Sequence, residues 1–533
     1  MEKRQLRAQL FRHLDGLVTA PIAHALIQRG VLKRILQDRT VDLDALSEDF
    51  SANAGYLNVA LRVLASQGFL DYNVDASTGN VRIDCNAKSE KAFGMFGMYQ
   101  SVVEMLDLSG NFHPRKFEEA PFRKLQAVHR EQQELAKKVP ANEPERSLYQ
   151  QILAHREGYI VGPTLVRLGM NGMFHQYFMS TSFRPEEFHK NSGLFRELLH
   201  ILTDMGWFTE KDGHFRFTDK GFFFAKRASA YGVTVSYLPT FRKIEELIFG
   251  NADVLRVTEP GKEELHVDRE MNVWGSGGAH SNYFKVVDEV IIDLFNRPIE
   301  EQPKGVLDMG CGNGAYLKHI FEVIEQRTLR GTMLEEHPLF LVGVDYNEAA
   351  LRATRSALIQ ADIWAKVIWG DISNPTALAD DLREHYDMDL GDLLNVRTFL
   401  DHNRIWKEPT EVKNTESSST GAFASRGKRL LNSHVEANLR EHFAAWSPYL
   451  QRFGLLMIEL HTVEPHLAAQ NIGRTAATAY DATHGFSDQY IVEIEVLHKV
   501  CREVGLEPDM AVFRRYPDTD YATVSINLLR GKK

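Results

Sequence analysis

A glycine-rich loop is the segment best suited to hold a small ligand. The apolar run GVLDMG contains the start of the pattern Asp308-x-Gly310-x-Gly312-x-Gly314, and a helical pattern, AYLKHIFEVI, follows it. Glycines at alternate positions allow a sharp turn and let the backbone approach a ligand without Cβ clashes. A dinucleotide fold prefers G-x-G-x-x-G, with the last glycine inside the helix. The spacing here favours a sulfonium amino acid held by glycine backbone and a nearby carboxylate.

Acidic residues end the next two strand-like runs. LFLVGVD ends in Asp345, where a carboxylate would accept both hydroxyls of a ribose, and AKVIWGD ends in Asp371, where an acceptor could meet an adenine amino group. The alternative for each acid is a turn cap at a strand end. Two more strand patterns and a terminal pair of strand-like segments follow, with helical patterns between them. The order predicts an α/β, Rossmann-like class I S-adenosylmethionine methyltransferase domain after a mostly helical region.

The predicted cofactor contacts come from these strand ends and from one earlier segment. In that segment, Trp274-Gly275-Ser276-Gly277-Gly278 could cross the methionine end of the cofactor. The predicted cofactor-binding residues are Asp308, Gly310, Gly312, Gly314, Asp345, Tyr346, Gly370, Asp371, Ile372, Asn395 and Gly275.

Candidate catalytic residues follow the fourth and fifth strands. In open α/β sheets the site lies beyond the carboxyl ends of the strands, where Asp401, His402 and His461 fall. His461 ends an apolar strand, and we predict that it acts as a base or a metal ligand rather than as a structural histidine. Asp401 could instead cap a helix.

The first half of the chain contains an internal repeat. Four residues recur 142 positions later, and two more recur at an offset of 138. The first set is His13, Gly16, Pro21 and Gly30, matching His155, Gly158, Pro163 and Gly172, and the second is Asn53 and Gly68, matching Asn191 and Gly206. Each copy reads as helices followed by two short strands, which is the winged-helix pattern.

A winged helix can place a recognition helix in a DNA groove, but the sequence does not favour that use here. The first candidate helix, residues 56–67, carries a single arginine, and the second pairs Arg196 with acidic neighbours. We therefore expect the modules to pack on one another or on a second subunit and to wall off a substrate pocket.

Composition excludes several classes of protein. The 533 residues carry a formal net charge of −10, which argues against non-specific nucleic-acid binding. The three cysteines are far apart, so neither a disulfide framework nor a paired-cysteine zinc site is expected. No run approaches the roughly 20 apolar residues of a membrane helix. We predict a cytoplasmic protein without nucleic-acid or membrane partners, and a homodimer is possible.

These patterns divide the chain into five segments. We predict a first winged-helix-like module at 1–110, a helical connector at 111–150, a second module at 151–250, a linker with a cofactor-lid helix at 251–300, and the methyltransferase domain at 301–533. An insertion at 407–430, rich in Ser, Thr and Gly, is predicted to be a mobile cover over the substrate, the alternative being an inert surface loop.

The second half resembles a known family in several segments. NVWGSGGAHSNYFKVVDEVI, RTFLDHNRIW, SSSTGAFASRGKRL and HFAAWSPYLQRFGLLMIELHTVEP resemble the C-methyltransferase domains of modular polyketide synthases. DATHGFSDQYIVE is similar to the metal-dependent methyltransferases of starter-unit-building modules. The resemblance implies methyl transfer to the α-carbon of an acyl group on an acyl carrier protein, assisted by iron or a similar divalent ion such as manganese. No ketosynthase or carrier sequence is recognisable in the chain.

The candidate metal ligands are His461, Gln489, Asp401 and His484, and His402 competes with Asp401 and His484 for the positions beside His461. Gln489 is supported mainly by the resemblance, because amide oxygens are weak ligands for transition metals. His484 could simply form a hydrogen bond in a turn.

Three functions are weighed. The first is a C-methyltransferase acting on a malonyl-type thioester with metal-assisted enolate formation. The second is a small-molecule O-methyltransferase of secondary metabolism with His461 as general base. The third is a cofactor-sensing regulator or interaction protein, which would need a basic face on the modules.

Overall fold

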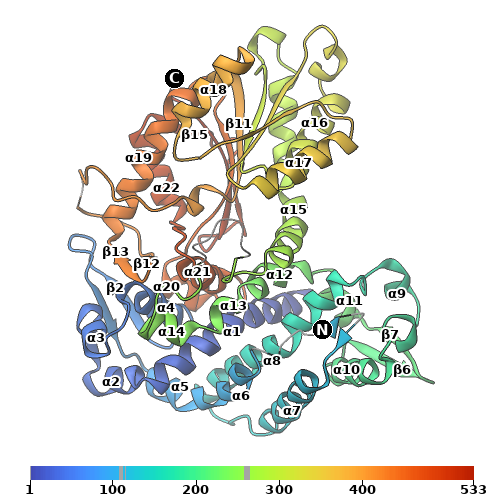
Figure 1. The fold of residues 1–533 in the computed structure, drawn as a ribbon. Helices are drawn as coiled ribbons and strands as arrows, with labels where there is room; N and C mark the ends of the chain where they lie inside the picture. Colours follow the sequence, from blue (N-terminus) through green and yellow to red (C-terminus); the bar gives the residue numbers. More distant parts are fainter. Residues whose placement is uncertain are drawn as a thin grey trace.

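A mixed eight-stranded sheet forms the upper half of the molecule (Figure 1). The computed structural model describes residues 2–106, 108, 112–113, 116–256, 264–413 and 415–532. The sheet has the order β10-β9-β8-β11-β14-β17-β15, with β16 also paired to β17. Its strands are β8 (Gly305–Met309), β9 (Phe340–Asp345), β10 (Lys366–Trp369), β11 (Leu393–Thr398), β14 (Leu455–Leu460), β15 (Leu506–Pro508), β16 (Arg514–Tyr516) and β17 (Val524–Gly531).

The first five strands of this order are parallel, and β17 runs antiparallel to β14, β15 and β16. Successive strand residues face opposite sides. On β8, Val306 packs toward the helices of one side and Leu307 toward those of the other. Those helices are α15 (Arg269–Phe295), α16 (Ala315–Arg327) and α17 (Glu348–Gln360) on one side, and α18 (Pro375–Tyr386), α19 (Asn432–Leu450) and α22 (Ile494–Glu503) on the other. The predicted α/β, Rossmann-like fold class is confirmed.

The lower half is helical and is built on two long crossing helices, α1 (Lys3–Gln28) and α8 (Glu145–Met170). They cross at glycines, because a Cβ on Gly16 would lie 2.2 Å from the Cα of His155, and a Cβ on Gly158 would lie 2.5 Å from the carbonyl oxygen of His13. Each repeated glycine therefore packs against the repeated histidine of the other copy. The residues that recur in the two copies therefore contact each other at the helix crossing.

Hydrogen bonds continue this reciprocal arrangement. The Nδ1 atom of His13 lies 2.8 Å from the hydroxyl of Tyr231, which follows the second copy. The Nδ1 atom of His155 lies 2.7 Å from the hydroxyl of Tyr99, which follows the first. All four side chains are buried, so the crossing is fixed by polar contacts as well as by close backbone packing.

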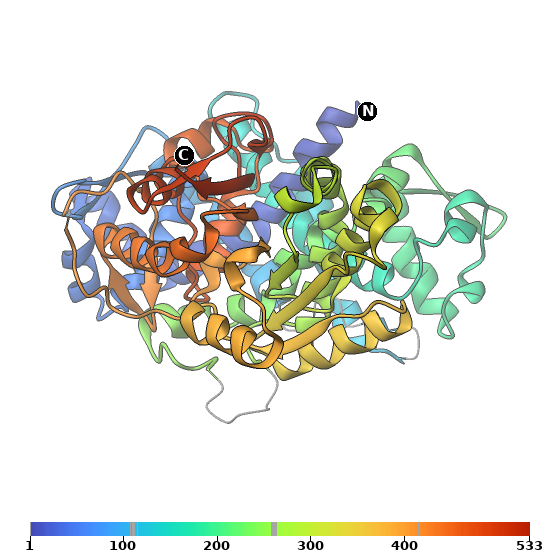
Figure 2. The ribbon, with the colours of Figure 1, turned by 90° about the horizontal axis from the view of Figure 1, so that it is seen from above.

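Each copy carries a winged-helix element at an end of the helical half. In the first, α4 (Ala54–Ser66) precedes a sheet of order β1-β3-β2, with β1 (Thr40–Asp42), β2 (Asp71–Val74) and β3 (Val81–Asp84). In the second, α10 (Ser192–Asp204) precedes the hairpin β6 (Phe208–Lys211) and β7 (His214–Phe217). Seen from above, the first module lies beneath the C-terminal part of the chain, while the second lies at the opposite end (Figure 2).

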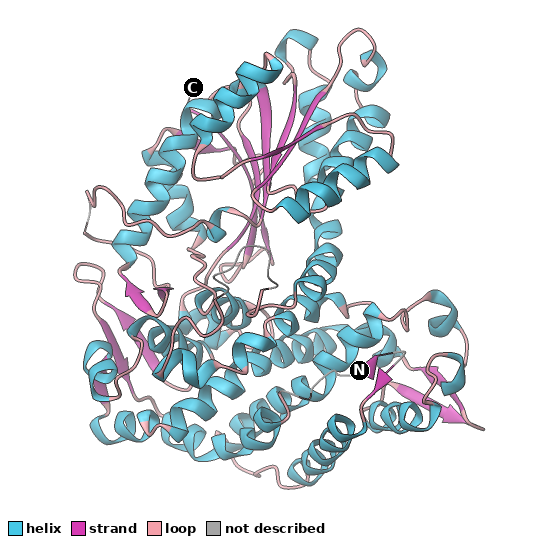
Figure 3. Ribbon diagram, in the orientation of Figure 1, coloured by secondary structure: helices cyan, strands magenta, loops and turns pink. Residues whose placement is uncertain are grey.

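The remaining α-helices and strands complete the two halves (Figure 3). They are α2 (Val31–Asp38), α3 (Leu43–Asp49), α5 (Ser89–Met95), α6 (Gln100–Glu104), β4 (Phe112–His113), β5 (Lys116–Phe117), α7 (Glu119–Ala136), α9 (Gln176–Ser180), α11 (Asp219–Ala225), α12 (Ser229–Ser236), α13 (Leu238–Phe241), α14 (Ile244–Phe249), β12 (Phe423–Ser425), β13 (Lys428–Leu430), α20 (Pro465–Gln470) and α21 (Ala477–Gly485). Among the described residues, no helix combines the length and apolar character required to cross a bilayer.

The insertion predicted as a mobile cover is packed between the two halves. Its hairpin of β12 and β13 lies against α4, and the buried Ser417 donates its backbone N–H to the carbonyl of Ala76 in the first module at 3.1 Å. The Arg429 side chain donates to the carbonyl of Gly79. This packing does not support a cover that opens and closes, because the segment joins the first module to the sheet domain.

Candidate active site

The glycine loop between β8 and α16 lies beside the carboxylate at the end of β9. Gly310, Gly312 and Gly314 all have positive φ angles, of 80°, 56° and 77°, which side chains rarely adopt. The backbone N–H of Gly312 donates to Oδ2 of Asp345 at 3.0 Å. The structure thus brings together the loop and the predicted ribose acceptor.

Asp308 lies beneath this loop, inside β8. It is fully buried, and burial together with the nearby carboxylate of Asp345 raises its pKa to about 7. Protonation of this carboxyl near neutral pH is therefore easier than in an exposed aspartate. The carboxyl can therefore donate or accept a hydrogen bond under the loop.

Two aromatic side chains flank the predicted adenine position. Tyr346 is 59% exposed and Trp369 is 53% exposed, with their ring centroids 5.4 Å apart. The Nε1–H of Trp369 donates to the carbonyl of Tyr346 at 3.0 Å, so the end of β10 holds the end of β9. Asp371 caps the following turn, with its Oδ1 accepting the N–H of Ser373 at 2.8 Å. Sequence reasoning missed Trp369, although an aromatic residue just before a strand-ending Gly-Asp is a usable signal for base stacking.

Gly370 and Ile372 sit at the same edge in packing roles. A Cβ on Gly370 would lie 2.5 Å from Cγ1 of Val344, so the position requires a small residue. The carbonyl of Ile372 accepts the indole N–H of Trp446 at 2.8 Å. Both positions support the geometry of the strand ends.

Two other predicted cofactor residues lie away from this edge. Asn395 is buried in the middle of β11, between Leu307 and Leu455 of the neighbouring strands. Gly275 lies within α15, where a Cβ would be 2.6 Å from the backbone nitrogen of Val233 in α12. These positions favour roles in the sheet interior and in a close helix crossing rather than cofactor contact.

The turn after β11 presents an oriented imidazole. Glu459 on β14 accepts the backbone N–H of Asp401 at 2.9 Å and that of His402 at 3.3 Å. Its other carboxylate oxygen lies 2.5 Å from Nδ1 of His402. The carboxylate therefore fixes both the turn and the ring, and in the described part of the chain no hydrogen bond engages Nε2 of His402. Glu459 was missed from sequence, where an acid within the apolar run LLMIEL was the available signal.

A second imidazole lies beside the first. His484 on α21 has its ring centroid 5.0 Å from that of His402, at an interplanar angle of 77°. Its Nδ1–H donates to the carbonyl of Tyr480 at 2.7 Å. Burial and the neighbouring His402 lower the pKa of His484 to about 3, so this ring is neutral near pH 7. The two rings thus come from different elements and meet at one place.

Asp401 belongs to a separate buried network. Its Oδ1 accepts from Arg397 at 2.6 Å and lies 2.8 Å from Nε2 of His442. Burial alone would raise the pKa of Asp401, but the Arg397 charge and the His442 hydrogen bond hold it well below its usual range. The carboxylate is therefore committed to a cation, which does not favour its predicted catalytic and metal-binding roles.

Both ring nitrogens of His461 are likewise occupied by hydrogen bonds within the protein. Its Nδ1 lies 3.0 Å from the carbonyl of Val492 and its Nε2 lies 2.6 Å from the hydroxyl of Ser525. The ring is fully buried, and burial lowers its pKa to about 3. The geometry does not favour His461 as a base or ligand, because the antiparallel strand β17 covers it and both ring nitrogens are already bonded.

A metal would find only part of the predicted ligand set. Within the described ranges, no three His, Cys, Asp or Glu side chains gather in a way that could hold an ion. His402 and His484 offer two nitrogens whose rings are oriented from behind by a carboxylate and a carbonyl, as metal-binding imidazoles usually are. Gln489 donates its backbone N–H to the carbonyl of His484 at 3.0 Å, and its side chain bonds the hydroxyl of Tyr237. A third ligand would have to be this amide or the substrate.

A cavity of about 710 Å³ lies beside the turn that carries His402. Asn403 and Arg404 of the turn line it, and Tyr490, which also lines it, donates its backbone N–H to the carbonyl of His402 at 2.8 Å. Tyr56 and Leu247 from the helical half also line the cavity. The prediction that the modules wall off a pocket agrees with this arrangement.

Comparison with known families identifies three domains. The model described as the AprA N-terminal domain matches residues 6–72, the AprA winged helix domain matches 157–251, and the AprA MT2-like domain matches 264–527. No curated protein matches the chain.

Solved structures resemble the chain weakly. An O-methyltransferase family protein from Burkholderia thailandensis is 13% identical with a TM-score of 0.39, covering 69% of this chain and 93% of that one. The CurJ carbon methyltransferase is 11% identical with a TM-score of 0.34, covering 76% and 98%. LepI, bound to SAH and a substrate analogue, is 10% identical with a TM-score of 0.40, covering 84% and 100%.

Likeness at this level carries no argument about activity, so the assignment rests on the family models and on the fold. The chain carries AprA-like N-terminal and winged helix domains followed by an AprA MT2-like methyltransferase domain, and it is an S-adenosylmethionine-dependent methyltransferase.

Proposed function

We propose that the protein methylates the α-carbon of a malonyl-type thioester carried by an acyl carrier protein in natural-product biosynthesis. The observation that carries the proposal is the imidazole of His402, which Glu459 orients through Nδ1 and whose Nε2 has no hydrogen-bond partner among the described residues. The next two residues of its turn, Asn403 and Arg404, line a cavity of about 710 Å³. A methyl sulfonium is already electrophilic, so the protein must generate and align a carbon nucleophile. A positioned base next to a thioester's α-carbon meets that requirement.

In this proposal His402 removes the α-proton. Nε2 accepts the proton, and the Glu459 carboxylate stabilises the resulting imidazolium through the bond at Nδ1. The pair of electrons left on carbon attacks the methyl group of S-adenosylmethionine, and S-adenosylhomocysteine leaves. The neutral His484 beside His402 favours proton uptake by His402, since it adds no like charge.

The cavity wall supports a thioester with an anionic arm. Arg256, Arg404 and Arg426 line it, and guanidinium groups suit carboxylate and phosphate oxygens. Asp488 already pairs with Arg256, and Asp253 pairs with Arg426. Arg404 bonds the side chain of Asn438 and the carbonyl of Asp401, and it forms no ion pair with a carboxylate among the described residues. The acyl-phosphopantetheine chain of a carrier protein combines a phosphate with a narrow apolar arm, so we propose the carrier as the partner.

A metal-assisted form uses the same two imidazoles differently. His402, His484 and the amide oxygen of Gln489 would hold a divalent ion such as iron or manganese, which would supply positive charge to a developing enolate oxygen. The two uses of His402 exclude each other. Metal analysis of protein purified without chelator, together with activity in chelator, separates them: full activity without metal supports the base.

An O-methyltransferase is the second candidate, because an imidazole backed by a carboxylate can equally deprotonate a hydroxyl group. With His461 bonded at both nitrogens, His402 would take the role predicted for His461.

Mass spectrometry of a carrier protein loaded with α-deuterated malonyl groups tests the proposal. Incubation with S-adenosylmethionine is expected to add one methyl mass and to remove one deuterium for each transfer. Glu459→Gln should slow this reaction by about 10²-fold, the low end of what general-base catalysis contributes. Glu384→Gln, at an exposed position of α18 on the same domain, is the matched control. No transfer to the carrier, with transfer to hydroxyl compounds instead, would establish the second candidate.

A further inference from the structure

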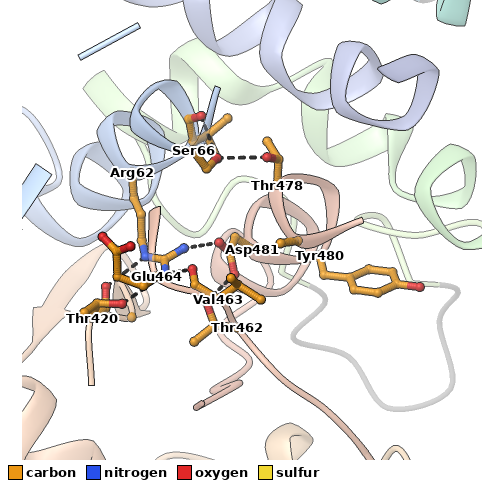
Figure 4. A network of polar contacts seen from close by, with 12 residues as sticks. Arg62, Ser66, Thr420, Thr462, Val463, Glu464, Thr478, Tyr480 and Asp481 are labelled. Carbon is orange, nitrogen blue, oxygen red and sulfur yellow. Dashed lines mark hydrogen bonds and ion pairs between the residues drawn. The ribbon is translucent and has the colours of Figure 1, made fainter. Parts of the chain in front are cut away.

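Helix α4 of the first module lies antiparallel to α21, the helix that carries His484. The contacts recur at each turn of α4. The first turn of α4 contacts the residues just after α21, and the last turn of α4 contacts the first turn of α21. The contacts are the hydroxyl of Tyr56 with Asp488 at 3.0 Å, the side chain of Val59 against Gly485, Arg62 with Asp481, and Ser66 with Thr478 at 2.9 Å. Figure 4 shows the central part of this interface.

Arg62 is the most buried charge in this interface and has no access to solvent beyond about 1% of its surface. Its guanidinium pairs with Asp481 and donates to the carbonyls of Thr420 at 2.8 Å and Val463 at 2.7 Å (Figure 4). Asp481 in turn accepts from the hydroxyl of Thr462 at 2.6 Å. A buried ion pair with this many partners fixes geometry, because removing one partner leaves an uncompensated charge.

The ion pair lies one helical turn from the active-site imidazole. Asp481 precedes His484 by three residues, so the two lie on one side of α21. The carbonyl of Tyr480, the residue before Asp481, accepts the Nδ1–H of His484 at 2.7 Å. A shift of α21 would therefore move His484 relative to His402, which is held independently by Glu459 on β14.

We propose that α4, the helix a winged-helix protein would use to read DNA, serves here to position His484, and that Arg62 is the positioning residue. The inference rests on the proposed function in one respect: it takes the His402 and His484 pair as the reacting site.

The repeat supplies a matched control. At the offset of 138, Arg62 corresponds to His200 on α10, whose Nε2 lies 3.0 Å from an oxygen of Glu210 at the surface. Arg62→Met should lower kcat on the malonyl-loaded carrier by between tenfold and about a hundredfold, since small displacements of reacting groups have effects of that size. Affinity for S-adenosylmethionine should stay within twofold, because the glycine loop lies elsewhere. Arg62→Lys should recover part of kcat, and His200→Met should change neither quantity.

An activity-independent measurement decides the positioning itself. In protein labelled with ¹³C-histidine, the Hε1 NMR signal of His484 is assigned by its loss in His484→Gln. Arg62→Met should shift that signal and His200→Met should not. If wild-type protein methylates no carrier, the proposed function fails, while the shifted signal still supports positioning by Arg62. An unshifted signal in folded Arg62→Met protein, with kcat within twofold of wild type, overturns the inference.

A second variant covers the case in which Arg62→Met does not fold. Arg62→Met/Asp481→Leu removes both charges, which often restores stability that the loss of one charge removes. A shifted His484 signal with low kcat in this variant supports the inference. Wild-type values of both would overturn it.

Discussion

The two copies of the winged-helix element present equivalent helices to very different surroundings. In α4, every residue from Gly55 to Ser66 is buried, between the first module and the methyltransferase domain. In α10, only five residues on one side are buried, at helical spacing. The difference shows that a duplicated element can keep its fold while one copy becomes interior and the other remains a surface helix.

The outer face of α10 is covered by polar contacts rather than by a core. Glu197 accepts from Gln126 of α7 at 2.6 Å, and Asp204 lies 3.2 Å from Nε2 of His129 on the same helix. The corresponding face of α4 carries Val59 and Arg62, which meet α21. A few substitutions on one helix face therefore separate a buried interface from a solvated one.

The largest effect is expected from giving α4 the residue that α10 has. Val59 is the counterpart of Glu197 at the offset of 138, and Val59→Glu would place a carboxylate against Gly485 without a partner. The free energy of unfolding should fall by about 3–5 kcal/mol or the chain should fail to fold. Urea denaturation measures this change.

The reverse change, Glu197→Val, serves as the control and should cost less than about 1 kcal/mol, because the Glu197 side chain is 42% exposed and its polar contacts lie near the surface. Equal losses from the two variants would contradict the contrast between the helices.

The next largest loss of stability is expected from a substitution at the crossing of α1 and α8. Gly16→Ala would drive a Cβ into the backbone of His155 at 2.2 Å, and backbone cannot move aside as a side chain can. We expect a loss of about 3 kcal/mol in the free energy of unfolding, the upper end for overpacking. Gly94→Ala in α5 is the control, since its Cβ meets nothing within 4 Å. A melting temperature unchanged in Gly16→Ala would exclude the observed crossing.

The smallest expected effect is a difference between the copies in how the free energy of unfolding changes with each pH unit. Asp15 and Glu157 are equivalent at the offset of 142, yet burial raises the pKa of Asp15 to about 8, with Gln67 and Arg12 opposing. Burial also acts to raise the pKa of Glu157, but His13, Lys220 and Gln9 together lower it below its usual value. The protonated Asp15 stabilises the fold fully below its unfolded pKa of 3.8, and this contribution is lost as pH rises through about 8. Glu157 contributes in the opposite sense, above its unfolded pKa.

Asp15→Asn should therefore flatten the decline in stability between pH 5 and pH 8, by up to about 1.4 kcal/mol per pH unit. Urea unfolding at several pH values measures the slope. A slope identical to that of wild type would show that Asp15 does not titrate in this range.

Much of the fold follows from local patterns in the sequence. The glycine loop and the acid at the end of β9 depend on short spacings, and the structure brings them together. The recurrence of His13 and Gly16 depends instead on a constant offset of 142, and the residues so matched meet at the helix crossing. Asp345 beside Gly312 is an example, because a strand end and a loop in a parallel sheet meet at one edge.

The positions of the reacting groups depend on which strands and helices pair with one another, and short spacings in the sequence do not reveal that pairing. His461 has the expected position along its strand, but the antiparallel pairing with β17 turns it toward Ser525. Glu459 acts two residues earlier, on the turn after β11, and its effect is visible only once those strands are adjacent. In the sequence, Arg62 is a single basic residue on a candidate recognition helix. Its role is visible only in the structure, where Asp481 lies beside it.

The pairing of α4 with α21 also sets an order of events during synthesis. Arg62 and Asp481 are separated by 419 positions, so at roughly 5–20 residues per second the ribosome needs about 20 to 80 s to add the partner. Throughout that interval the apolar surface of α4 has no methyltransferase domain to cover it. The nascent chain therefore exposes the apolar surface of α4 early in synthesis. We expect chaperone association to peak between synthesis of the first module and emergence of α21.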